Sequence, residues 1–417
     1  MRQKKGYNMA DFPGAVDITT ANGLFKKVYG DLENVIPVGK KVAELIPFLA
    51  KAKTGESYNV AVILGLEHGV TYEASDAGAF QLNDAIAGSV KQASIKGNQI
   101  VLRSAMSYES VFRSQGSEQA FQETTKYVIQ NMMDSLYKKL EVELMYGQDG
   151  IGVIDAAPAP TATSFKILDA EFAPGIWSGS RGMKLDVYNG VTLVGTAQVQ
   201  RVDLTTKIVT LQGVGIAGIA AGHKIFPANA FGKQMLGMKK IMQNTGLMFG
   251  IDAAQYELWE GTTFALPTTD VLSFAVVQQA ITKGVEKGLD KDVVLLCNPG
   301  HWDDLLTEQA ATRMYDSSYS SNQAENGAKS IKFHSQNGMV EIVPYIHVKE
   351  GHAMIICKDD WRRIGSTDVT FKRPGQPDKY FLELQSHAGV ELRAYSDQAI
   401  LCNKPGRQIL ITNLKVS

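Results

Sequence analysis

The chain has 417 residues, of which 44% are hydrophobic and 20% are charged, and its formal net charge is −1. This length predicts two or three domains. The near-neutral charge excludes a strongly basic nucleic-acid-binding protein, although it leaves room for local basic patches. A low charged fraction fits a chain that buries surface against copies of itself, and it equally fits a glycine-rich β protein.

The three cysteines are far apart and form no CxxC motif; they are Cys297, Cys357 and Cys402. This spacing predicts reduced, buried thiols in a protein made in a cytoplasm. No apolar run reaches the roughly 18 residues of a membrane span, and the N-terminal MRQKK leads into polar sequence. We therefore expect a soluble protein with no membrane contact and no secretory signal peptide.

Residues 1–50 are punctuated by glycine and proline and carry one short helical pattern over 21–28. Such a segment cannot bury enough of its own surface to fold alone. We expect it to lie as an extended arm over another surface.

Residues 51–113 contain two strand-like stretches, 58–64 and 90–104. The glycine-rich sequence between them, 65–88, has no clear period. Two strands joined by a long excursion predict a protruding hairpin loop. A long loop without a core of its own usually has a function or a partner, and an isolated hairpin is marginal in water. We therefore expect this hairpin to rest on another subunit.

A long helix is predicted over 117–147. Its apolar residues recur every four positions, as in a helix and not a strand: Val128, Met132, Leu136, Leu140 and Leu144, with Phe121, Ile129 and Met133 widening the stripe. Ser117 is a suitable N-cap and Gly147 a suitable left-handed C-cap. About 30 residues at 1.5 Å each give a rod of about 45 Å. Such a rod either spans a domain or forms a long core helix in an α/β enzyme.

Residues 150–232 are rich in Gly, Ala, Val and Thr. Short strands are predicted at 165–168, 183–187, 196–203, 207–211 and 224–226. Asn189-Gly190 marks one hairpin turn, and 203–207 marks another. This pattern predicts a small antiparallel β-barrel inserted into a larger domain, with its two ends close together.

The remaining sequence, from 233 onward, mixes helices and strands. We predict helices over 272–285 and 299–312, and a polar loop over 314–329. Predicted strands are 293–297, 339–344, 353–357, 380–385, 390–395, 399–402 and 408–412. The fold class is therefore α+β.

Catalytic and ligand motifs are weak. Gly213, Gly215 and Gly218 have the GxGxxG spacing, but a strand-like segment at 224–226 leaves no room for the helix that would hold a pyrophosphate, so we interpret them as barrel turns. His347 and His352 are five residues apart in β-like sequence, which does not suit a zinc site. The sequence has no GxSxG, HExxH, P-loop or EF-hand motif.

Other polar residues are assigned structural roles. We expect His301 to cap or pack on its helix, and Asp303, Asp304, Glu141 and Glu143 to be solvated charges on helix faces. A methionine cluster is interpreted as core: Met132, Met133, Met235, Met238, Met242 and Met248. We predict no catalytic, cofactor-binding or metal residues and no cofactor, which favours a structural protein over an enzyme.

The order of these parts resembles the major capsid protein of tailed double-stranded DNA bacteriophages, with the Hong Kong ninety-seven-type fold. The sequence CNPGHW at 297–302, where a strand meets a helix, is typical of that family's axial domain. The resemblance implies the following division: N-terminal arm 1–50, E-loop 51–113, P-domain 114–149 and 360–417 with a spine helix over 117–146, inserted β domain 150–232, and A-domain 233–359 with connecting P-domain segments.

The resemblance also implies a function. The chain would self-assemble, through hexameric and pentameric capsomers, into an icosahedral shell that encloses a double-stranded DNA genome without catalysis. Its partners would be copies of itself, a portal, possibly scaffolding and cement proteins, and packaged DNA bound non-specifically. It would reside in the virion after assembly in the host cytoplasm, and no fused, cleaved scaffolding region is expected.

Some family members cross-link an E-loop lysine to a neighbour's asparagine. Lys91 and Lys96 lie in the matching region, but no partner asparagine is identifiable, so this chemistry is not assigned. Two alternatives stay open. One is an encapsulin-like compartment shell with the same fold, and the other is an oligomeric enzyme in which 51–113 forms an active-site lid.

Overall fold

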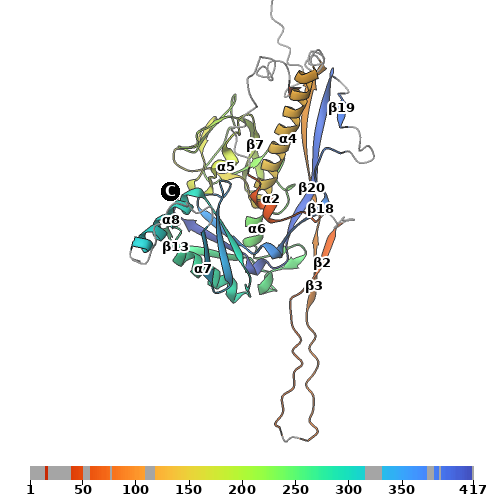
Figure 1. Cartoon of the computed structure of the whole chain (residues 1–417), viewed down its shortest axis with the longest axis vertical. Helices are drawn as coiled ribbons and strands as arrows, with labels where there is room; N and C mark the ends of the chain where they lie inside the picture. The colour runs from red at the N-terminus through yellow and green to blue at the C-terminus, as the bar shows by residue number, and fades with distance from the viewer. Residues whose placement is uncertain are drawn as a thin grey trace, which may run out of the picture. The chain divides into compact units, whose positions relative to one another are not determined.

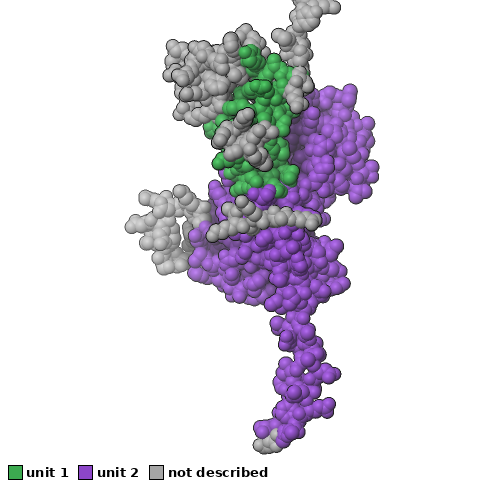
Figure 2. Space-filling view, turned by 90° about the vertical axis from the view of Figure 1, so that its right-hand side faces the viewer, with its two compact units in different colours: residues 1–38, 99–139, 367–397 green, residues 39–98, 140–366, 398–417 purple. Residues whose placement is uncertain are grey.

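The computed structural model describes residues 15–16, 39–49, 57–75, 78–108, 118–314, 331–372, 380–384 and 387–415, without the side chains of 15–16, 118–126 and 309–314. Two compact units divide the chain: unit 1 comprises 1–38, 99–139 and 367–397, and unit 2 comprises 39–98, 140–366 and 398–417 (Figure 2). The predicted helix over 21–28, the Ser117 cap and all but the first residue of the 314–329 loop lie outside the described residues.

The first sheet belongs mainly to unit 1 and has the strand order β1-β4-β20-β18, with β19 also paired to β20. Its strands are β1 (Ala15–Val16), β4 (Asn98–Ser107), β18 (Trp361–Thr370), β19 (Phe381–Glu383) and β20 (Gly389–Cys402). The long helix α4 (Glu118–Tyr146) runs along this sheet (Figure 1). A shared apolar core joins helix and sheet: Met106, Val128, Met132, Leu136, Leu392 and Ala394.

Helix α4 confirms the predicted long helix and most of its apolar stripe, since the five residues spaced by four are all buried. Ile129 is 36% exposed, so its assignment to the stripe was wrong. The left-handed C-cap was also misplaced, because Gln148 and not Gly147 has a positive φ of 60°. A Cβ on Gly147 would lie 2.2 Å from the carbonyl oxygen of Met235. Glycine is needed there for close backbone approach, not for handedness.

The main sheet of unit 2 has the order β13-β21-β17-β14-β16-β15 and mixes parallel and antiparallel pairs. Its strands are β13 (Thr262–Asp270), β14 (Val293–Cys297), β15 (Ile331–Ser335), β16 (Gly338–Pro344), β17 (His352–Ile356) and β21 (Ile409–Leu414). Helices α7 (Phe274–Glu286) and α8 (Pro299–Met314) contribute to its apolar core. Every residue of β14 is buried, because the strand is central and covered.

Three sequence predictions about strands need correction. Strands β13, β15 and β18 were not predicted. The predicted strands 390–395 and 399–402 are one strand, β20, since the polar Ser396 and Gln398 between them are buried within it. The predicted strand 90–104 is two strands, because the chain leaves one pairing at Lys96-Gly97 and enters another.

Segment 360–417 does not return as a whole to the sheet that α4 covers. Strand β21 lies between β13 and β17 in the main sheet of unit 2, with Ile411 opposite Phe264 and Ala353. The apolar pattern of a strand does not show which strand it pairs with. The sequence therefore could not show that β18 and β20 belong to one sheet and β21 to another.

The β-rich region 150–232 forms a second six-stranded sheet in unit 2, with the order β5-β10-β7-β8-β9-β6 and only antiparallel pairs. Its strands are β5 (Gly152–Val153), β6 (Ser164–Lys166), β7 (Lys184–Asn189), β8 (Thr192–Val202), β9 (Ile208–Leu211) and β10 (Lys224–Pro227). The end strands are also linked, because Leu168 N–H donates to Val153 O at 2.8 Å and Asp155 N–H to Lys166 O at 2.9 Å.

Both predicted hairpin turns of this region are confirmed. Gly190 has a φ of 60° between β7 and β8, and Lys207 has a φ of 61° between β8 and β9. Asp203 stabilises the second turn, since its Oδ1 accepts from the Thr205 and Thr206 backbone N–H groups at 2.9 and 3.1 Å.

The two-stranded hairpin of β2 (Tyr58–Ile63) and β3 (Val90–Ile95) extends from unit 2 and carries a long loop at its end (Figure 2). The predicted hairpin is therefore confirmed. Its base is held to the rest of unit 2 by a hydrogen bond from Ser94 N–H to Phe249 O, at 2.8 Å, and by the Ser89 and Tyr256 hydroxyls, 3.3 Å apart.

The packing of β14 predicts a large cost for truncating its central side chain. We expect Leu295→Ala, at a position that is 0% exposed, to lower the free energy of unfolding by about 2–5 kcal/mol through lost burial and a cavity. Leu247→Ala is the matched control, because Leu247 is 76% exposed and the change should stay within about 0.5 kcal/mol. Denaturant titration of the unassembled subunit measures both, and equal effects would contradict the assigned core.

Candidate functional site

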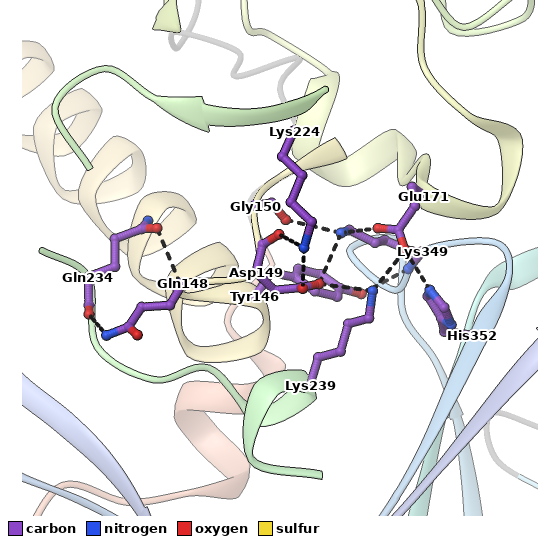
Figure 3. A network of polar contacts seen from close by, with 10 residues as sticks. All are labelled: Tyr146, Gln148, Asp149, Gly150, Glu171, Lys224, Gln234, Lys239, Lys349 and His352. Carbon is purple, nitrogen blue, oxygen red and sulfur yellow. Dashed lines mark hydrogen bonds and ion pairs between the residues drawn. The ribbon is translucent and has the colours of Figure 1, made fainter. Parts of the chain in front are cut away.

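A buried network of charged side chains lies where the β-rich region leaves and rejoins the chain (Figure 3). We call Asp149, Glu171, Lys239, Lys349 and His352 the ionic cluster. They come from four segments of unit 2: the turn after α4, the short 3-10 helix Asp169–Glu171, helix α6 (Met238–Met242), and the start of β17 with the turn before it.

The carboxylate of Glu171 is the centre of the ionic cluster. It accepts from Lys349 Nζ at 2.5 Å and Lys239 Nζ at 2.8 Å, and His352 Nε2 lies 3.0 Å away. Asp149 pairs with Lys239 Nζ at 2.9 Å and with the half-exposed Lys224 Nζ at 3.1 Å. Each acid thus faces more than one cation.

Lys349 is the most deeply buried of the cations, with 1% of its side chain exposed. Its Nζ lies 4.4 Å from the ring centroid of Tyr146 and donates to Gly150 O at 3.0 Å. The hydroxyl of Tyr146 accepts from the Lys349 backbone N–H at 2.9 Å. A cation–π contact and these hydrogen bonds replace the water that the ammonium group loses.

Burial alone would raise the pKa of Glu171, but Lys349, Lys239 and His352 outweigh it and hold that pKa well below its usual range. The pKa of Asp149 is likewise lowered by Lys349, Lys239 and Lys224 against the effect of burial. Both acids are therefore ionised at neutral pH. Removing one partner from such a set leaves an uncompensated buried charge.

Backbone hydrogen bonds also join the segment that contains Glu171 to the segment that contains Lys349. Gly175 N–H donates to Ile346 O, Glu350 N–H to Phe172 O, and Gly351 N–H to Ala170 O, each at 2.9 Å. A further ion pair joins Lys207 Nζ to Glu350 at 2.5 Å. Residues 170–175 are thus fastened to the turn that precedes β17.

The ends of the β-rich region lie close together, as predicted. The Gln148 side-chain amide donates to Gln234 O at 2.7 Å, and Gly237 N–H donates to Gly147 O at 3.0 Å. Because Glu171 lies inside the region and neutralises Lys349 outside it, deletion of 155–230 would also remove part of the ionic cluster.

Glu141 and Glu143 are buried, so their assignment as solvated charges was wrong. Glu141 accepts from the Val42 and Ala43 N–H groups, at 3.1 and 2.7 Å, and from the Tyr345 hydroxyl at 2.7 Å. Both N–H groups belong to α2 (Lys41–Leu45). A carboxylate at the start of this short helix satisfies free backbone donors.

Arg363 binds the C-terminal end of helix α2. Its guanidinium donates to Ile46 O at 2.6 Å, to Ala43 O at 3.2 Å and to the Gln398 side chain at 2.9 Å, and all of these groups are buried. Residues 39–49 therefore pack within unit 2 and do not belong to an extended arm that ends at residue 50.

Among the described residues, the carboxylate of Glu143 accepts one hydrogen bond, from Met235 N–H at 2.9 Å, and no cation pairs with it. Burial raises its pKa to about 7, and the hydrogen bond lowers it only in part. The side chain is thus partly protonated near neutral pH, in contrast to Glu171 and Asp149.

The hairpin loop presents apolar side chains that no described part of the chain covers. Tyr72 is 87% exposed and Leu82 is 73% exposed. The others that are largely exposed are Ile63, Leu66, Val70, Phe80, Ile86 and Val90. Asn83 orders the loop, since its backbone N–H donates to Thr71 Oγ1 at 2.8 Å and its amide to Val70 O at 2.9 Å. Concentrated exposed apolar surface of this kind marks an interaction site.

The remaining candidates have structural surroundings. Gly213, Gly215 and Gly218 all have positive φ and lie between β9 and β10, and residues 219–223, which connect them to β10, form no helix. His301 is buried and its Nε2 contacts Glu350 O at 2.5 Å. His347 is buried and His352 belongs to the ionic cluster; within the described ranges, no group of three or more His, Cys, Asp or Glu residues is placed to hold a metal.

The three cysteines are free and buried, as predicted. Burial raises the pKa of Cys297 to about 12 and that of Cys357 to about 11, so neither is a ready thiolate. Asp303 is exposed and Asp304 partly so, which agrees with solvated charges. Among the described residues, no helix has both the length and the apolar character needed to cross a bilayer.

No family model matches the sequence and no curated protein is similar to it. Solved structures are similar in fold. A chain of the cyanophage A-1(L) capsid asymmetric unit is 11% identical, with 93% of this chain and 96% of that one covered and a TM-score of 0.57. A Gordonia phage Cozz chain is 11% identical with complete coverage of both chains and a TM-score of 0.45. The Synechococcus elongatus SrpI encapsulin complex is 7% identical, with 96% of both chains covered and a TM-score of 0.45.

The cyanophage similarity establishes the class of fold: this chain has the α+β fold of a phage capsid protein. The predicted resemblance is confirmed at that level. Sequence reasoning missed the ionic cluster, because its members are spread over about 200 positions. A weak signal was present in the pair Lys349 and Glu350, which stand in otherwise apolar sequence.

The ionic cluster predicts an unequal response to two acid substitutions in the same short helix. Glu171→Gln leaves Lys349 and Lys239 with Asp149 as their only acid, and should lower the free energy of unfolding by about 3–5 kcal/mol. Asp169→Ala is the matched control, since Asp169 pairs with Lys166 and Lys207 but is 41% exposed, and should cost about 0–1 kcal/mol. Denaturant unfolding of both variants checks this, and equal losses would refute a central role for Glu171.

Glu143 predicts a pH-dependent gain in stability. A folded-state pKa of about 7, raised from 4.5, means that the folded protein holds a proton that the unfolded chain releases. The contribution of Glu143 is therefore fully present below pH 4.5 and is lost as pH rises toward 7. Glu143→Gln should have little effect at pH 5 and should stabilise the protein by about 1–3 kcal/mol at pH 8.

The measurement for Glu143 is the difference in unfolding free energy between Glu143→Gln and the unchanged protein at each pH, because subtraction removes the titration of other groups. The burial-lowered pKa of His352, for example, acts in the opposite direction as pH falls. A difference that does not change between pH 5 and 8 would contradict the raised pKa.

Proposed function

We propose that this chain is a major capsid protein that self-assembles into the icosahedral shell of a tailed bacteriophage and encloses its double-stranded DNA. The fold shared with the cyanophage capsid chain supports this function. The single observation that carries the proposal is the hairpin loop, whose exposed apolar side chains are suited to a neighbouring copy of the same chain.

The proposal assigns roles to the parts of the chain. The hairpin and its loop are the E-loop. Helix α4 and the sheet of β4, β18 and β20 form the P-domain, and the sheet that contains β14 forms the A-domain. Region 150–232 is an inserted β-barrel domain, supported by its separate sheet and its linked end strands. The N-terminal arm consists of the residues that precede Gly39.

Shell assembly follows from many modest contacts. Each subunit in a closed shell touches several neighbours, so that each further contact forms at a high effective concentration. Stable obligate interfaces bury about 2,000–5,000 Å², and a long projecting hairpin can supply such area without a globular interface. Hexameric and pentameric capsomers, a portal, and scaffolding or cement proteins are the further partners of this proposal, with the virion as its location. DNA contact is non-specific and no catalysis is involved.

The hairpin loop provides the test. We expect Tyr72→Ser with Leu82→Ser to prevent closed particles, because both side chains would otherwise be buried against a neighbour. Val191→Ser with Val214→Ser is the matched control, since those valines are equally exposed but lie in region 150–232. Negative-stain microscopy counts closed particles, and circular dichroism of the soluble subunits shows whether the variants are folded.

Three results would contradict the proposal. Unchanged protein that never forms closed particles would refute a shell function and favour the oligomeric enzyme. Particles that protect protein cargo and no DNA would instead indicate an encapsulin-like compartment. Closed particles formed equally well by the hairpin variant and the control would remove the hairpin from the assembly mechanism.

A further inference from the structure

A recess of about 660 Å³ lies on the β-rich region of unit 2. One wall is the segment 177–181, which follows α5 (Pro174–Trp177), and the other is the hairpin of β8 and β9. Strand pairing places Arg201 opposite Thr210, so both belong to the second wall. Recesses of this volume accommodate small organic ligands.

Two arginines in the lining have no ion-pair partner within the part of the chain that the structure describes. Neither Arg181 nor Arg201 forms an ion pair or a side-chain hydrogen bond with a described residue, although both line the recess. Arg407, in contrast, pairs with Asp290 at 2.7 Å. Asp203 interacts electrostatically with Arg201 but forms no ion pair with it within the described residues, and its Oδ1 already accepts two backbone N–H groups.

The same lining contains buried polar atoms without partners. Ser180 is 8% exposed, and its Oγ has no hydrogen-bond partner among the described residues. The indole Nε1 of Trp177, a residue that is 1% exposed, is also unpartnered. A buried polar group that lacks a partner is unfavourable, so such atoms are seldom left unsatisfied in folded proteins.

We propose that this recess binds a small organic carboxylate of the size of a sugar acid. The guanidinium groups of Arg181 and Arg201 supply the charge-assisted, fork-shaped donors that a carboxylate requires. Ser180 and Gln200 add uncharged hydrogen-bonding groups for hydroxyls of the ligand. Val202 and Leu204 form an apolar part of the lining, which suits a carbon skeleton better than a bare inorganic anion.

The test is calorimetric titration of the full-length protein at constant ionic strength with glucuronate, glucose, inorganic phosphate and chloride. We expect glucuronate to bind with a dissociation constant of about 1 mM or below, and glucose, which lacks the carboxylate, to bind at least about tenfold more weakly. Arg181→Gln and Arg201→Gln should each weaken glucuronate binding about tenfold or more. Arg362→Gln is the matched control, since Arg362 is exposed in β18 and outside the recess, and should leave binding unchanged.

Ser180→Ala separates a binding role from a structural one. If the hydroxyl serves the ligand, its removal should weaken glucuronate binding about threefold or more while the unfolding temperature of the unliganded protein does not fall, because no internal hydrogen bond is lost. A fall in that temperature with unchanged affinity would overturn this role.

Three binding results would overturn the proposal. One is glucuronate binding no stronger than that of glucose or chloride. Another is glucuronate binding that survives the combined change of Arg181 and Arg201 to glutamine. The third is binding of phosphate but not of glucuronate, which would show that the recess is a site for an inorganic anion and not for an organic carboxylate.

Discussion

The neutralisation of Lys349 is the constraint on which the arrangement of unit 2 depends. This ammonium group has lost nearly all contact with water, and it is compatible with the fold only because Glu171, Tyr146 and Gly150 converge on it from other segments. The convergence fixes the end of α4, the start of the β-rich region and the entry to β17 at one point. A region held at a single pair of flanking residues could swing, whereas region 150–232 is held at its entry, its exit and an internal helix.

A second buried arrangement, around Glu141 and Arg363, fixes the chain before the hairpin. Together these contacts give unit 2 a rigid body, from which β2, β3 and their loop project with little polar anchoring beyond Ser94 and Ser89. Under the proposed function, this combination would suit assembly from identical copies. The body would keep one shape in every copy, while the hairpin, which has few polar contacts with the rest of unit 2, would adapt to neighbours at slightly different angles.

Helices and strands can be predicted from the sequence where buried residues recur at a regular period. Which strands pair, and which side chains meet, can be predicted only poorly. Helix α4, strand β14 and the turns at Gly190 and Asp203 were predicted because a repeat of apolar residues or a turn residue determines them locally. The assignment of β21 to the main sheet and the burial of Glu141 depend on residues more than 50 positions away, which no local pattern reports. From the sequence alone, an acidic residue on a helix is predicted to be solvated. The distant partners that bury Glu141 are the backbone of α2 and the hydroxyl of Tyr345.

The position of β21 bears on how unit 2 folds. Residues 409–414 occupy an interior position in the main sheet of unit 2, so β13 and β17 have no common neighbour until this strand is in place. Since neither strand can complete its hydrogen bonding earlier, a prematurely terminated chain lacks a closed core and exposes two unpaired strand edges. A chain interrupted before residue 409 would therefore be a misfolded fragment that proteases remove, rather than a shortened but folded subunit.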